Sequence, residues 1–194
     1  MAKLPRDVTA VLKRQAPRVL KKDFDREFKS KFDKLKKEMI SEFLSHPVTV
    51  EILAGASSGN TSGTLGGVAN LYSFIGFNTG DKPIEPIIKI LEATNFSDKG
   101  PSKQGIGRAF SVNIPNPEDI FAITPMPWAA GRSWAKGIET GISGIGYLLN
   151  KSSKSSRSGV AIQAEKRVRS GRFQNVPYIS ALIKKYEKKF KELS

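Results

Sequence analysis

The sequence of 194 residues contains no cysteine and a single histidine, His46. The lack of cysteine excludes disulfide bonds, thiolate metal sites and cysteine nucleophiles, and a single histidine excludes a metal site built from several imidazoles. No run of 18 apolar residues occurs, so no membrane-spanning helix is predicted. Residues 1–18 lack the continuous apolar core of a signal peptide, which favours the cytoplasm, or a particle assembled there, as the compartment.

Motifs of common enzymes are also missing. Residues 80–82 (Gly-Asp-Lys) lack the leading glycine and the following Ser or Thr of a Walker loop, and the glycine-rich residues 100–107 do not lie between a predicted strand and a predicted helix. We therefore expect a protein that is not an enzyme and that holds no metal ion and no cofactor. An enzyme would require distant carboxylates, such as Glu51, Glu118 and Glu139, to converge in one cleft.

Positive charge is what the sequence has in excess. It contains 32 Lys and Arg against 18 Asp and Glu, which gives a net charge of +14, and residues 151–194 hold twelve of the basic residues against three glutamates. This balance favours a polyanion or an acidic protein surface as partner. A basic tract within this part is the candidate for such contacts: Lys151, Lys154, Arg157, Lys166, Arg167, Arg169 and Arg172. The tract could also be a solvated loop.

The clearest periodic signal predicts a long helix over residues 7–44, kinked near Pro17. Its apolar side chains are spaced 4, 4, 3, 4 and 4 residues apart on one stripe: Phe24, Phe28, Phe32, Leu35, Met39 and Phe43. The stripe fits a surface helix lying on a core, or a seam with another subunit. Pro47 ends the helix, and we expect His46 to cap it or to pack against it.

Two strands, residues 48–54 and 70–77, are predicted to flank a loop over residues 54–67 that is rich in Gly, Ser, Thr and Asn. Such a loop has little apolar surface to bury and loses much conformational entropy when it becomes ordered. We expect it to extend to a neighbouring subunit and to become ordered only on assembly.

The rest of the chain is predicted to alternate between helices, strands and loops. The expected elements are a helix over 83–94, a loop over 95–107, a hairpin of strands 108–114 and 119–123, a strand or loop over 133–139, a strand over 160–168, and a closing helix over 175–193. The predicted fold class is α+β, an antiparallel sheet flanked by the N-terminal and C-terminal helices. A single domain over 1–194 would comprise a helical segment 1–45, a β-rich body 46–174 and a C-terminal helix 175–194.

Three short segments resemble motifs of a known family. They are residues 62–66 (Ser-Gly-Thr-Leu-Gly), 134–141 (Trp-Ala-Lys-Gly-Ile-Glu-Thr-Gly) and 177–182 (Pro-Tyr-Ile-Ser-Ala-Leu). In this order, after a long helix, they resemble the T-G-x-L-R, Y-A-x-x-V-E-x-G-T and P-F-L-x-P-A-L segments of the tail-completion (neck) proteins of tailed bacteriophages. Gly66 stands in place of the arginine, and Thr140-Gly141 reverses the Gly-Thr order.

The resemblance implies a structural virion protein, assembled in the host cytoplasm, that forms a ring of six or twelve copies where head meets tail. Its partners would be itself, the portal or connector protein and tail tube or sheath proteins, with non-specific contact to packaged DNA and no membrane. Trp128 and Trp134 are added as interface candidates because aromatic anchors dominate contact energies; the alternative, above all for Trp134, is an ordinary core tryptophan. The full set of interface candidates is Ser62, Gly63, Thr64, Leu65, Gly66, Trp128, Trp134 and Glu139. The alternative is a basic nucleic-acid-binding module, either ribosome-associated or DNA-packaging.

Overall fold

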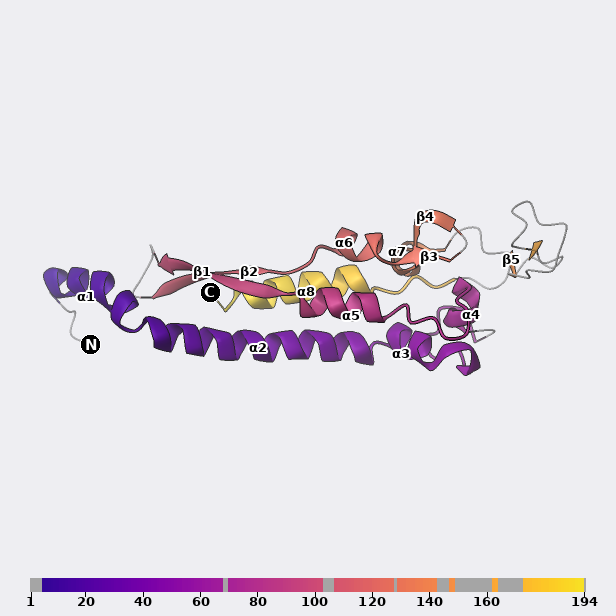
Figure 1. Ribbon diagram of the computed structural model, residues 1–194, viewed down its shortest axis with the longest axis horizontal. Helices are drawn as coiled ribbons and strands as arrows, with labels where there is room; N and C mark the ends of the chain where they lie inside the picture. Colours follow the sequence, from indigo (N-terminus) through magenta and orange to yellow (C-terminus); the bar gives the residue numbers. More distant parts are fainter. Residues whose placement is uncertain are drawn as a thin grey trace.

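The computed structural model describes residues 5–67, 70–102, 107–127, 129–142, 147–148, 162–163 and 173–193. Within these ranges the chain forms eight α-helices, one short 3-10 helix and three two-stranded antiparallel ribbons, so the fold is α+β. Figure 1 shows that the described elements form an elongated arrangement, with α2 running parallel to its long axis through the middle. None of the helices in these ranges is long and apolar enough to cross a bilayer.

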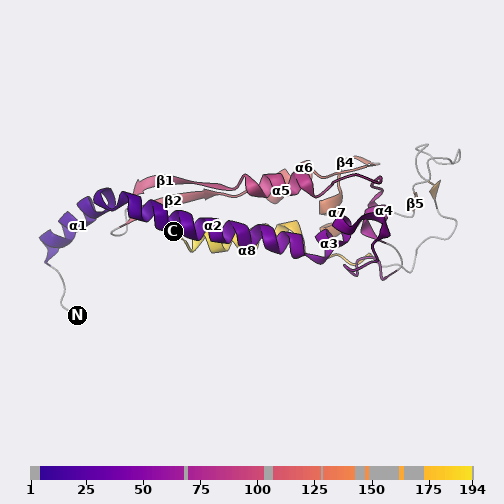
Figure 2. The ribbon, with the colours of Figure 1, turned by 60° about the horizontal axis from the view of Figure 1, so that its bottom comes forward.

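The predicted N-terminal helix is two helices, α1 (Arg6–Val19) and α2 (Lys21–Ser45). The break falls at Leu20 and not at Pro17, which lies within α1. Since α1 contacts the body only near its C-terminal end, it projects beyond the other helices in both views (Figures 1 and 2).

The apolar stripe of α2 lies on the core, as the spacing predicts. Phe28, Phe32, Met39 and Phe43 are buried. One end of the stripe is covered by the ribbon of β1 (Asn95–Pro101) and β2 (Arg108–Asn113), because Phe28 stacks on Phe110 with 4.0 Å between ring centroids. The rest is covered by α8 (Ile179–Lys191), which contacts α2 along its length. The stripe is therefore filled within one chain and is not a seam for another subunit.

The two strands predicted beside the glycine-rich loop are wrong, because both segments are helical. Residues 47–54 form α3 (Pro47–Ala54), which begins with Pro47 at its first turn and His46 as its N-cap. Residues 71–75 form α4 (Leu71–Ile75), which Asn70 caps at the start and Gly76 ends at a φ of 90°. In short apolar runs, periodicity does not distinguish a strand from a buried helix. The capping residues at the ends of these two segments are the features that favour a helix.

In the middle of the chain, one predicted helix is present and the elements around it differ from the prediction. The 3-10 helix η1 (Gly55–Ser57) lies within the predicted glycine-rich loop. The predicted helix is α5 (Glu85–Glu92), and β1 follows it in residues predicted as loop. β2 matches a predicted strand, but it pairs with β1 in antiparallel register. The second strand of the predicted hairpin is instead α6 (Pro117–Ala122), which begins with a capping box between Asn116 and Asp119.

The C-terminal half also contains more helix than predicted. β3 (Pro125–Met126) and β4 (Ala129–Ser133) form a short ribbon, and the residues predicted as strand or loop form α7 (Trp134–Thr140). β5 (Tyr147–Leu148) pairs with β6 (Ile162–Gln163), which lies within the predicted strand 160–168. The described part of residues 46–174 is thus not β-rich. One hydrophobic cluster joins side chains from α2 through α8.

Candidate functional site

Segments far apart in the sequence meet at residues 174–180, immediately before and at the start of α8. The backbone N–H of Gln174 donates to the carbonyl of Thr64 at 3.0 Å, and that of Val176 donates to the carbonyl of Ile138 at 3.2 Å. These bonds join the glycine-rich loop, α7 and the entry to α8. The first segment of the family resemblance is thereby tied to Gln174 and the second to Val176, immediately before the third, and we call this meeting point the junction.

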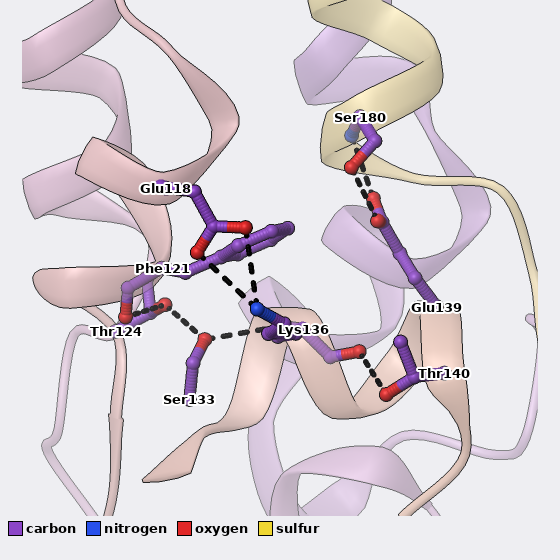
Figure 3. Close-up of polar contacts among 8 residues, drawn as sticks. All are labelled: Glu118, Phe121, Thr124, Ser133, Lys136, Glu139, Thr140 and Ser180. Atoms are coloured by element: carbon purple, nitrogen blue, oxygen red, sulfur yellow. Dashed lines mark hydrogen bonds and ion pairs between the residues drawn. The ribbon is translucent and has the colours of Figure 1, made fainter. Parts of the chain in front are cut away.

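Glu139 fixes α7 to the N-terminal end of α8. Its Oε1 accepts the backbone N–H of Ser180 and its Oε2 accepts the Ser180 hydroxyl, both at 2.6 Å (Figure 3). A carboxylate is favourable there, because the first amides of a helix have no partner in the helix and carry partial positive charge. Glu139 was predicted to contact a partner, but both of its oxygens are engaged within the chain.

The start of α7 is held against α6 by a second polar group (Figure 3). The Ser133 hydroxyl caps α7 by accepting the Lys136 N–H at 3.1 Å and lies 2.7 Å from the Thr124 hydroxyl. The Lys136 ammonium lies 3.2 Å from both carboxylate oxygens of Glu118 and 5.5 Å from the ring centroid of Phe121. α7 is therefore clamped on two sides.

Trp134 opens α7 and points into the core. It is 1% exposed and meets Phe77 edge-on, with ring centroids 5.8 Å apart. The predicted role of Trp134 as a surface anchor is therefore wrong, because its indole is covered by side chains of its own chain. Trp128, the other predicted anchor, lies outside the described residues.

A buried tyrosine and a half-buried histidine attach the junction to α2 and α3. The Tyr178 hydroxyl lies 2.8 Å from that of Thr49, and burial raises the pKa of Tyr178 above its usual value. His46 caps the end of α2, as expected, and also accepts the Val48 N–H at 3.3 Å to begin α3. Burial lowers the pKa of His46, although the carbonyl of Pro177, 3.2 Å from Nε2, acts in the opposite direction.

The glycine-rich loop folds around Glu51, a fully buried carboxylate on α3. Its Oε1 accepts the Leu71 N–H at 2.7 Å and its Oε2 accepts the Ser62 N–H at 2.8 Å. The Asn60 amide donates to both oxygens, at 3.0 and 3.2 Å. The carboxylate therefore ties the middle of the loop and the start of α4 to one point on α3, and it has the partners that a buried charge requires.

Asn60 supplies the turn inside the loop. Its side-chain oxygen accepts the N–H groups of Leu65 and Gly67, at 3.0 and 3.2 Å. Thr64 and Leu65 are buried as a result. The expectation that this loop is ordered only on assembly is wrong, since its polar backbone groups find partners in the same chain. We call this unit the Glu51 latch.

The other loop residues predicted at an interface fall into two groups. The Ser62 hydroxyl lies 2.9 Å from that of Thr64, so its hydrogen bond is made within the loop. Gly63 and Gly66 face solvent at φ values of 70° and 61°. Of the segment 62–66, these two glycines keep an exposed surface.

A cluster of opposite charges joins α2 to α8. Lys185 lies 2.6 Å from Glu42, and Lys189 pairs with Glu38 one turn further along. The hydrogen bond from Lys185 lowers the pKa of Glu42, while burial and these carboxylates raise that of Tyr186. These ion pairs link the two helices and neutralise part of the basic charge of α8.

The three carboxylates that an enzymatic cleft would require are engaged in separate places. Glu51 serves the latch, Glu118 pairs with Lys136 and Glu139 caps α8, so the three carboxylates do not share a cleft. The same ranges contain no group of three or more His, Asp or Glu side chains placed to hold a metal ion. The predicted polyanion contacts all lie outside the described residues: Lys151, Lys154, Arg157, Lys166, Arg167, Arg169 and Arg172.

The two residues that organise the loop were not predicted from the sequence. Glu51 falls within the predicted strand 48–54, and Asn60 falls within the predicted loop 54–67. A usable signal was present, since an acidic residue within an apolar helix of the core must be paired.

Comparisons with models of protein families, with curated proteins and with solved structures found no match, so a function must be inferred from residues and geometry.

Proposed function

We propose that this protein is a structural component of a tailed-phage virion, a ring-forming neck or tail-completion protein that joins the head connector to the tail. The observation that carries the proposal is the uncovered apolar face of α1. Val8, Val11, Leu12 and Val19 recur at helical spacing, and all four are exposed, Val11 by 52% and Val19 by 78%. Single exposed apolar residues are ordinary, but a contiguous stripe on a projecting helix marks a contact surface.

The junction gives independent support. The segments that resemble neck-protein motifs lie far apart in the sequence. Hydrogen bonds tie the first two of them to residues 174–176 and join Glu139 of the second to Ser180 of the third. This arrangement adds to the likeness in residue type on which the proposal rests.

The direct test is the assembly state of the full chain. Size-exclusion chromatography with light scattering should give a mass of six or twelve 21.3 kDa subunits, alone or with a connector or tail protein. Negative-stain electron microscopy should show closed rings. A chain that stays monomeric with every such partner would overturn the proposal.

The net charge of +14 favours a second candidate, a basic nucleic-acid-binding module. The same chromatography separates the two functions when duplex DNA is added at low and at high salt. A monomer that shifts with DNA at low salt and is released at high salt would support the second candidate, because phosphate contacts release counterions. Rings that ignore DNA would support the first.

A further inference from the structure

The apolar stripe of α1 has no partner within the described part of its own chain. α1 is 14 residues long, and its C-terminal end is held to the β1–β2 ribbon by Arg108, which donates to the carbonyl of Pro17 at 3.0 Å. A helix of this length is marginal in water without packing on its apolar side. Val8, Val11 and Leu12 are therefore uncovered by the residues that the structure describes, and a second copy of the chain could cover them.

An apolar pocket is lined by residues of α3, η1, α4 and α5. Of these elements, α3 and α4 lie toward the end of the molecule opposite α1 (Figures 1 and 2). The volume of the pocket is about 540 Å³, and its apolar lining includes Ile52, Leu53, Ile84 and Ile88. Leu53 is 56% exposed. This is large and open enough to accept side chains from a helix, which bind grooves through residues spaced three and four apart.

The two surfaces also differ in charge. The sequence of α1 holds four basic residues against one acidic residue, and the exposed Arg14 and Arg18 follow Val11 by three and seven residues, so they lie beside the apolar stripe. The pocket is rimmed by the acidic side chains of Asp81 and Glu85 with a single lysine, Lys82, already paired with Glu85 at 2.7 Å. A basic apolar helix and an acidic apolar pocket are complementary.

We propose that α1 of one copy docks in the α3–α5 pocket of the next copy. The two surfaces are different and lie at opposite ends of one elongated chain, so the contact is head-to-tail. Contacts of this kind close into rings when the rotation between copies allows it. This inference rests on the proposed function, and it names the surfaces through which the ring would form.

Engineered thiols test the contact, because the full chain contains no cysteine. Val11→Cys protein is mixed with a tagged Leu53→Cys protein and treated with a short bismaleimide. We expect a cross-linked heterodimer from the mixture, and no cross-link from either variant alone. Ser30→Cys, on an exposed face of α2, replaces Leu53→Cys as the matched control and should give none. Dimers from Val11→Cys protein alone would show that α1 pairs with α1, which overturns the head-to-tail contact.

A charge on the stripe gives a second, independent readout. Val11→Asp should convert the assembled protein to monomer on light scattering, while its melting temperature as a monomer stays that of the wild type. An unchanged assembly would overturn the proposal. The two proposals fail differently: rings without the Val11–Leu53 cross-link remove this contact and keep the neck function, whereas cross-linked open chains without rings keep the contact and remove the neck function.

Discussion

Replacing the buried carboxylate of the Glu51 latch should destabilise the whole subunit. In Glu51→Gln, one acceptor oxygen becomes an NH2 group, which then faces the N–H of either Leu71 or Ser62 at less than 3 Å. The variant loses a charge-assisted hydrogen bond and leaves a buried donor without an acceptor, which together cost about 3–6 kcal/mol before relaxation. Removing the buried charge offsets part of this, so we expect a net loss of about 2–4 kcal/mol.

The measurement is urea unfolding followed by far-ultraviolet circular dichroism, with linear extrapolation to water. Digestion by thermolysin, which cuts before Leu65, should accelerate in the variant, because the loop is released. Glu27→Gln is the matched control, since Glu27 is exposed and pairs only with Lys31 on the same helix; it should unfold as the wild type does. Equal midpoints for Glu51→Gln and Glu27→Gln would show that the loop is not held by this carboxylate, and the reasoning would be refuted.

Three further changes test the core and the junction. Phe32→Ala should cost about 3–5 kcal/mol, because a buried ring between Phe96 and Phe190 is lost; a loss in urea unfolding below about 1 kcal/mol would mean that the stripe is not core. Gly137→Ala should lower the melting temperature despite the better helix propensity of alanine, because its Cβ would lie 2.9 Å from Ile142; a rise would contradict the packing. His46→Asn keeps a capping side chain and removes a titrating one. Since burial lowers the pKa of His46 from 6.5, the wild type should lose stability as the pH falls below that value. The variant should lose less between about pH 7.5 and 5.5, and an identical pH dependence would exclude His46 as a contributor.

The helical stripe of α2 shows where sequence was sufficient. A period near 3.6 sustained over many residues leaves one solution, a helix with one apolar face. The same holds for α5 and α8, which are close to their predicted ranges, although α8 begins at Ile179 and not at 175. The side chains that cover these faces could not be predicted, because Phe96, Phe110 and Phe190 reach α2 from distant parts of the sequence.

The short elements show where sequence failed. α3, α4, α6 and α7 are each eight residues or fewer, and their apolar residues fit alternation as well as they fit a helical face. Their caps were visible in the sequence: a Pro at the first turn of α3 and α6, an Asn before α4 and α6, and a Ser before α7. Capping residues are stronger evidence than alternation in segments of this length.

The sequence by itself determined that the chain lacks thiol chemistry, carries strong positive charge and builds its core on one long amphipathic helix, because each of these depends on composition or on local periodicity. Only the tertiary structure decided that the glycine-rich loop is folded around Glu51 and that Trp134 and Glu139 face inward. It also decided that the uncovered apolar surface lies on α1. These outcomes depend on contacts between residues from 9 to more than 40 positions apart, and no local pattern specifies which buried polar groups will bond to each other.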